Sequence, residues 1–356
     1  MSDNVLGEWP APNATLVAVV EQDDDVAYLY FWNPNGPQTV PRSVWIRNLC
    51  KAPESFTKDR MNEGLPPILP IDCVRHPDGA PPLEADALSF EWFPEGDGGV
   101  LFEGDDILVV VPPWAMDSGF SKDCLRETPV ALPLPVDQSW IEDRIQSARR
   151  HWARWDEDTA WDSFRQSIED AVVKVFGGSP RRFGATDEWW PPRELLQTPM
   201  EGGVALTTIG MSARPMPQVE TYLDDAHLFR RIEIGMALSN ECGDEVVQSA
   251  RSYLSAQMKY PWFVNSWFGN GHTLPCDAIP PSWFRSYPFV LMTSRPPGAP
   301  VVELPDVDGD SVTLLWLVPI TEKEQALAER DGSDAVLERL HARGLGWPHR
   351  RRKDVS

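Results

Sequence analysis

The sequence predicts an α+β protein in which a β-rich N-terminal part precedes a part that mixes strands and helices. Short strands with alternating polarity occupy the first 135 residues, and strands and helices then alternate irregularly up to the C-terminus. With 356 residues, 42% of them hydrophobic, the chain has enough apolar material for two cores. We therefore predict an acidic β-rich domain at residues 1–135, a helical connector at 136–157 and an α+β domain at 158–356.

The N-terminal part contains strand patterns separated by turn residues. Strands are predicted at residues 16–20, 26–31, 44–46, 87–93, 100–102 and 107–111. The segments 33–37 and 94–99 are rich in Pro, Gly and Asn or Asp and predict turns. Pro112 and Pro113 end the last strand, because proline cannot donate to a strand ladder.

The pattern changes after residue 135. Ile141, Ile145, Ala148 and Trp152 recur at helical spacing, and a second helix from about residue 158 stops at Gly177. The remaining elements are strands at residues 204–209, 231–238, 288–292 and 312–319, and helices near 246–254, 322–330 and 334–343. A capping box is predicted at the start of the helix at 322–330.

The charge balance limits the classes of partner. The chain has 54 Asp and Glu against 32 Lys and Arg, a formal net charge of -22. Nucleic acid is a poor partner for such a surface, whereas a basic protein suits it; solubility alone is the simpler explanation. Residues 1–10 contain no secretory signal, no apolar run is long enough to span a membrane, and five widely spaced cysteines indicate free thiols. We expect a cytoplasmic location and no cofactor.

Several motifs of the C-terminal half occur in a recognisable order. An amphipathic helix ends at Phe176-Gly177, and the strand 206–212 ends in Gly210-Met211-Ser212. Further on lie the strand 231–234 and the segment 312–324, in which a strand is followed by Pro-Ile-Thr and then a Glu. Together these motifs, over about residues 160–355, resemble the suppressor of fused (Sufu) family. Residues 1–135 carry no such resemblance.

The resemblance implies a Sufu-like mixed sheet with flanking helices that serves as a protein-interaction module. Animal members hold a transcription-factor peptide of Hedgehog signalling as an added strand near their Gly-Leu-Ser strand, and bacterial members are often immunity proteins of polymorphic toxin systems. The peptide-binding role carries over to Ile209, Gly210, Met211 and Ser212. Because Ala213 replaces the acidic residue that commonly follows the Ser, the immunity role is favoured. We expect a non-catalytic protein that sequesters a protein partner, such as a basic toxin.

The alternatives are a hydrolase and a small-molecule sensor. Gly210-Met211-Ser212-Ala213-Arg214 partly resembles a nucleophile elbow built on Ser212, but the second Gly is missing. We predict no catalytic residue and no metal site, because no two Cys or His pairs have ligand spacing. Aromatic residues are concentrated from Trp262 and Trp267 to Trp283 and Phe284. They form either core or a binding surface for a partner or a small molecule, and we include Trp262 and Trp267 among the candidate partner-binding residues.

Overall fold

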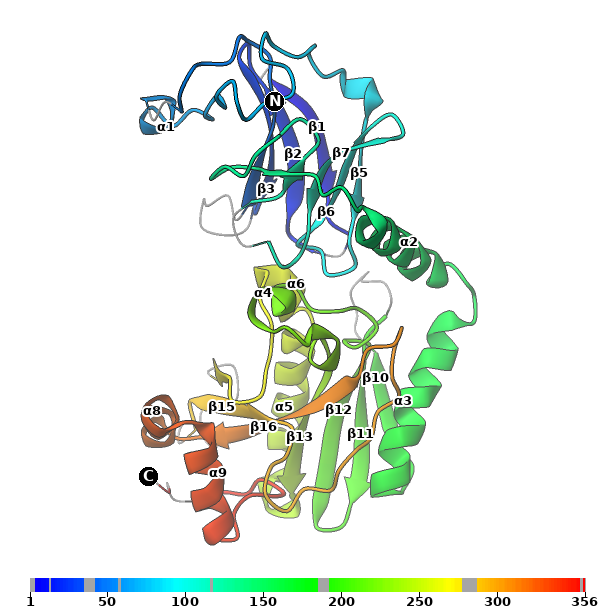
Figure 1. The fold of residues 1–356 in the computed structure, drawn as a ribbon. Helices are drawn as coiled ribbons and strands as arrows, with labels where there is room; N and C mark the ends of the chain where they lie inside the picture. Colours follow the sequence, from blue (N-terminus) through cyan, green and yellow to red (C-terminus); the bar gives the residue numbers. More distant parts are fainter. Residues whose placement is uncertain are drawn as a thin grey trace. The chain divides into compact units, whose positions relative to one another are not determined.

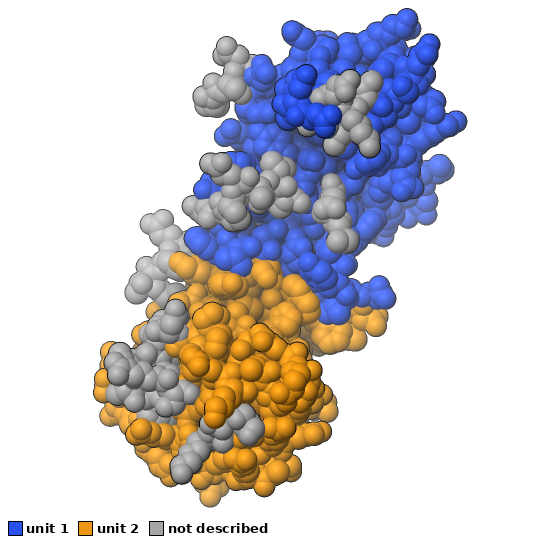
Figure 2. All heavy atoms as spheres, turned by 90° about the vertical axis from the view of Figure 1, so that its left-hand side faces the viewer, with its two compact units in different colours: residues 1–154, 217–224, 262–265 blue, residues 155–216, 225–261, 266–356 orange. Residues whose placement is uncertain are grey.

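The computed structural model describes residues 4–12, 14–34, 42–56, 59–115, 118–184, 192–276, 287–352 and 355. Its contacts divide the chain into two compact units, shown in Figure 2. Unit 1 comprises residues 1–154 with the short segments 217–224 and 262–265, and unit 2 comprises the rest. None of the described helices has the length and apolarity that a membrane crossing requires.

Unit 1 contains two sheets and one long helix (Figure 1). The first sheet is an antiparallel meander of β1 (Val5–Pro10), β2 (Val17–Gln22), β3 (Val26–Trp32) and β4 (Arg42–Asn48). The second has the order β5 (Leu88–Trp92), β6 (Gly99–Glu103), β7 (Asp106–Val111), β8 (Phe120–Ser121) and β9 (Leu132–Pro133). The short α1 (Asp59–Asn62), α4 (Val219–Tyr222) and α6 (Tyr260–Val264) lie in loops between the longer elements.

The two sheets of unit 1 share a core. Phe31 and Trp45 from the first sheet belong to the same buried cluster as Phe90 and Leu101 from the second, so the inward faces of both sheets are apolar. Helix α2 (Ser139–Arg154) packs Ile141 and the following apolar positions of its stripe against β6 and β7 through a separate cluster. The segment 136–157, which we predicted as a connector, thus contains a helix that the contacts assign to unit 1.

Unit 2 is built on a seven-stranded mixed sheet. Its order is β10 (Arg181–Gly184), β11 (Glu194–Met200), β12 (Gly203–Ile209), β13 (Arg231–Ser239), β16 (Val312–Ile320), β15 (Phe289–Thr293) and β14 (Thr273–Pro275). Among the described strands of this sheet, only β13 and β16 pair in parallel, and both are buried along nearly their whole length. The sequence predicted strands at 231–238 and 312–319.

Helices cover this sheet. Helix α3 (Ala160–Phe176) packs its predicted apolar face on β11 and β12 and ends at Gly177, whose φ is 70°. Helix α5 (Gly243–Gln257) contacts β11, β12 and β13, and α8 (Glu322–Asp331) and α9 (Ser333–Ala342) pack against β15 and β16. The predicted α+β class is confirmed, with β-rich sheets in the N-terminal part and a mixed sheet flanked by helices after it.

Most predicted elements are present, and the ones we did not predict have weak patterns. Strand β10 is mostly exposed at the sheet edge and has no alternating polarity, while β1 contains Gly7 and Pro10 and β11 contains Pro199. The capping box is confirmed: the Thr321 hydroxyl accepts from Glu324 N, and the Glu324 carboxylate accepts from Thr321 N. Residues 35–37 of one predicted turn lie outside the described residues.

Candidate functional site

The Gly-Met-Ser segment follows β12 directly and turns into the protein interior. Gly210 has φ 116°, and a Cβ at this position would lie 2.5 Å from the backbone oxygen of Pro192, so only glycine fits. Ile209, Met211 and Ser212 are each 0% exposed. The side chains of this segment therefore pack inside unit 2.

A buried carboxylate organises the turn. Glu233, on β13, accepts hydrogen bonds from Gly210 N and Ser212 N at 3.0 Å each, from Ser212 Oγ at 2.7 Å and from Thr208 Oγ1 at 2.6 Å. Burial raises the pKa of the Glu233 carboxyl above its usual range, and the four hydrogen bonds oppose that rise. The carboxylate joins the end of β12 to β13, where the regular ladder between these strands stops at Thr207 and Gly235.

An arginine holds the next residues of the chain. Arg231 donates to the carbonyl oxygens of Ser212 and Ala213 at 3.0 and 2.9 Å, and it pairs with Asp310 and Asp308 at 2.8 and 3.0 Å. These two carboxylates belong to the acidic loop 306–310, which forms a tight hairpin closed by hydrogen bonds between Val307 and Asp310. The two carboxylates thus bind an arginine, and the described residues hold no group of three or more possible metal ligands.

The predicted partner-binding residues differ in accessibility. Strand β12 pairs with β11 on one side and β13 on the other, so Ile209 and the residues before it do not form a sheet edge. Trp262 is 2% exposed and its segment belongs to unit 1. Trp267 lies in unit 2, where it is half-buried and packs edge-to-face on His272, with 4.5 Å between ring centroids. Trp283 and Phe284 lie outside the described residues.

The charged residues at the centre of this turn were absent from our sequence-based selection. Glu233 and Arg231 lie in a strand whose other residues are largely apolar, and both are almost fully buried. A charge in a buried strand requires a partner, because burying an unpaired charge is costly. That pattern was the signal that could have identified them. Their partners, Ser212 and Asp310, come from distant segments that no local pattern links to β13.

The C-terminal motif forms a comparable arrangement. The buried Glu324 carboxylate pairs with Arg352 at 2.5 Å, besides capping Thr321 N at 2.9 Å and accepting from Val355 N at 2.8 Å. Arg352 also donates to the Pro319 carbonyl at 3.1 Å. The Pro-Ile-Thr segment and the Glu that follows it thereby bind the end of the chain to the sheet.

Comparison with known proteins identifies part of the chain. Residues 192–350 match the model of the family described as Suppressor of fused protein (SUFU). The curated proteins include no match.

Among the similar solved structures, three have a TM-score of 0.38 each. A protein described as a SUFU homologue from Neisseria gonorrhoeae FA 1090 is 16% identical, and the match covers 55% of this chain and 98% of that one. The Sufu-Fu complex structure is 12% identical, with coverage of 54% and 92%. Drosophila Suppressor of Fused is 14% identical, with coverage of 53% and 50%. From the family match, which confirms the prediction from the motifs, residues 192–350 are a domain of the suppressor of fused family.

Proposed function

We propose that the protein is a non-catalytic binding protein that sequesters a basic protein partner in the cytoplasm, as an immunity protein sequesters a toxin. The observation that carries the proposal is the SUFU-family domain at residues 192–350, because that family consists in general of non-catalytic binding proteins. The charge distribution specifies the kind of partner.

The acidic charge is concentrated in the N-terminal part. Residues 1–135 contain 22 Asp and Glu against 8 Lys and Arg, which accounts for most of the net charge of -22. A surface of one sign attracts partners of the opposite sign and raises their association rate. A basic toxin is therefore the partner class that this protein would capture fastest.

The environment of Ser212 supports binding over hydrolysis. A nucleophilic serine must reach the substrate and needs a base beside it. Ser212 Oγ is fully buried and donates its hydrogen bond to Glu233, which also accepts from two backbone N–H groups of the same turn. The Gly-Met-Ser segment thus has a structural role, and this role accounts for the presence of Ser212 without a catalytic function.

The test of the proposal uses the proteins encoded by the genes next to this one, since immunity proteins are encoded beside their toxins. Each is purified and titrated against this protein in a calorimeter, which gives the stoichiometry, and stopped-flow fluorescence at low and high salt gives the association rate. We expect one neighbour to bind at a fixed stoichiometry, with an association rate that falls steeply as salt is raised. A partner whose association rate does not change between low and high salt would contradict the charge argument. If no neighbouring product binds, the sequestration proposal is wrong.

The hydrolase alternative has its own test. The wild-type protein and Ser212→Ala are assayed side by side on generic ester substrates. We expect no turnover by either protein. Turnover by the wild type that is lost in Ser212→Ala would replace the binding proposal with an enzymatic one.

A further inference from the structure

Three neighbouring hollows of unit 1 follow one flank of helix α2. The first, about 520 Å³, lies between the C-terminal half of α2, β5 and the end of β1. The second, about 590 Å³, lies between α2, β5 and the β6–β7 hairpin, and the third, about 800 Å³, lies near the start of α2. The first two share Glu91 and Arg149, and the last two share Asp105 and Ile107. We call these three adjoining hollows the α2 trough.

One end of the α2 trough is aromatic. Trp9, Phe90, Trp92 and Trp152 line it, with Phe90 and Trp92 ring centroids 4.9 Å apart. Trp92 Nε1 donates to the Trp9 carbonyl and Trp152 Nε1 to the Trp92 carbonyl, each at 3.1 Å. Because these hydrogen bonds hold the indoles in place, the trough presents rigid apolar walls. Such walls accept prolines and aromatic side chains with little loss of entropy on binding.

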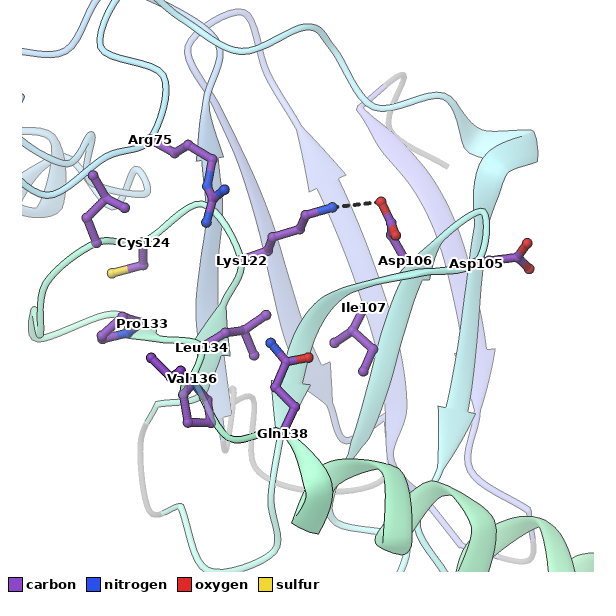
Figure 3. A pocket seen from close by; sticks show the side chains of 12 residues that line it. Arg75, Asp105, Asp106, Ile107, Lys122, Cys124, Pro133, Leu134, Val136 and Gln138 are labelled. Atoms are coloured by element: carbon purple, nitrogen blue, oxygen red, sulfur yellow. Dashed lines mark hydrogen bonds and ion pairs between the residues drawn. The ribbon is translucent and has the colours of Figure 1, made fainter.

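The other part of the α2 trough carries three carboxylates that form no ion pair with the described residues. Asp105, Glu142 and Asp143 are exposed, and the described residues form no hydrogen bond or ion pair with their carboxylates. The cations that line the trough have acidic partners of their own, since Arg149 pairs with Glu91, Lys122 pairs with Asp106 at 2.8 Å, and Arg75 lies 3.9 Å from Asp123. Figure 3 shows Asp105 pointing away from the Lys122–Asp106 pair. Three negative charges therefore remain available to a bound cation.

We propose that the α2 trough binds an extended segment of the protein partner that has proline or aromatic residues at one end and two or three Arg or Lys at the other. This deepens the proposed function and rests on it. The path from Gln138 to Trp152 is about 21 Å long on helix geometry, which an extended segment of about six residues would span. The apolar end would pack on the rings, and the basic end would pair with Asp105, Glu142 and Asp143.

A defined peptide probe tests the proposal. The probe is a fluorescent peptide with the sequence Gly-Pro-Trp-Pro-Gly-Arg-Lys-Arg, measured by anisotropy against the full-length protein. A second peptide has Glu in place of the three basic residues, and a third has Ser in place of Trp and both flanking Pro. We expect the first peptide to bind and each altered peptide to bind at least about tenfold more weakly. If the Glu peptide binds as well as the basic one, or if the basic peptide does not bind at millimolar protein, the proposal is overturned.

Protein variants locate the binding to the trough. Asp105→Asn, Glu142→Gln and Asp143→Asn are combined, and the matched control combines Glu54→Gln, Asp78→Asn and Asp224→Asn. The control residues are exposed, line none of the three hollows and change the formal charge by the same amount. We expect the trough variant to lose about tenfold in affinity and to depend less on salt, and the control to keep wild-type binding. Equal weakening in both variants would assign binding to the overall charge and refute the trough.

The two proposals can fail separately. A neighbouring gene product that binds the wild type and the trough variant equally well would leave sequestration intact and remove the trough. If the peptide binds in the trough but no neighbouring product binds the protein, the sequestration proposal fails and the recognition surface remains.

Discussion

The carboxylates of the Gly-Met-Ser turn in unit 2 and those of the α2 trough in unit 1 are the same functional group in opposite environments. Glu233 is 1% exposed and accepts four hydrogen bonds from neighbouring groups of its own unit. Asp105, Glu142 and Asp143 are exposed, and the described residues supply no donor to them. The interior carboxylate is already fully bonded and therefore stabilises the fold. The exposed ones retain their capacity to bind a cation, so recognition belongs on that surface.

The strongest way to break this comparison is to remove the interior carboxylate. Glu233→Ala would leave Gly210 N, Ser212 N and Ser212 Oγ buried without the acceptor that they share. Each unsatisfied buried donor costs about 1–3 kcal/mol, so we expect unit 2 to lose about 4 kcal/mol of unfolding free energy. Urea unfolding of the wild type and the variant measures the loss. A loss below about 1 kcal/mol would show that water or rearrangement replaces the carboxylate.

The next effect concerns the buried ion pair at the C-terminus. Arg352→Met would leave the Glu324 carboxylate charged and buried, which costs about 3 kcal/mol when one partner of such a pair is removed. Adding Glu324→Gln to this variant removes the stranded charge, and we expect the double variant to recover part of the loss. A double-mutant cycle in urea gives the coupling energy. If the losses of the single variants Arg352→Met and Glu324→Gln add up to the loss of the double variant, the two residues do not stabilise the fold as a pair.

A third effect is the pH dependence of the stability of unit 2. Burial lowers the pKa of His349 to about 3, with a smaller contribution from Arg352. The unfolded chain has the ordinary histidine pKa of about 6.5, so it binds a proton first as the pH falls. The stability that neutral His349 contributes is therefore complete above about pH 6.5 and is lost toward pH 3, by at most about 1.4 kcal/mol per pH unit.

Comparison of the wild type with His349→Gln isolates this contribution, because every other titrating group is common to both proteins. We expect the urea-unfolding free energy of unit 2 to depend less on pH in His349→Gln between pH 6 and pH 4. Equal slopes for both proteins would mean that His349 takes up its proton without unfolding.

The smallest stability effect is expected in the trough. The combined Asp105→Asn, Glu142→Gln and Asp143→Asn variant should change the unfolding free energy by less than about 0.5 kcal/mol, because exposed, unpaired charges contribute little to the fold. Thermal unfolding beside the Glu54, Asp78 and Asp224 control measures it. A stabilisation confined to the trough variant would show mutual repulsion among its carboxylates, and a marked destabilisation would show that they have structural partners.

The elements that could be predicted from the sequence are those with a strong local pattern. The strand Val312–Ile320 has a long apolar run, the strand Arg231–Ser239 is largely apolar apart from two charges, and the helix Ser139–Arg154 has a 3.6-residue period. The structure contains all three. The edge strand Arg181–Gly184 has neither, because its pairing comes from β11 and not from its own composition. This strand forms only because it pairs with β11, so the sequence of residues 181–184 alone did not predict it.

The candidate site was predictable only in part. The motif Gly210-Met211-Ser212 was found from its resemblance to the Sufu family, and its role as a partner-binding segment stays a prediction. In the structure its side chains are buried, and the residue that organises it, Glu233, lies 21 residues beyond Ser212 in the chain. The trough was not visible at all, because Trp9 and Trp92 are 83 residues apart and Trp92 and Trp152 are 60 apart.

The sequence by itself determined the α+β class, the acidic charge and the main strands and helices, and its motifs carried the resemblance to the SUFU family. The class, the charge and the elements depend on composition and on patterns within short segments, so they can be read without coordinates. Only the tertiary structure decided which carboxylates are buried and hydrogen-bonded and which are exposed without a partner among the described residues. A side chain's burial and hydrogen-bond partners are set by segments that meet when the sheets and helices pack, and chain distance does not predict those meetings.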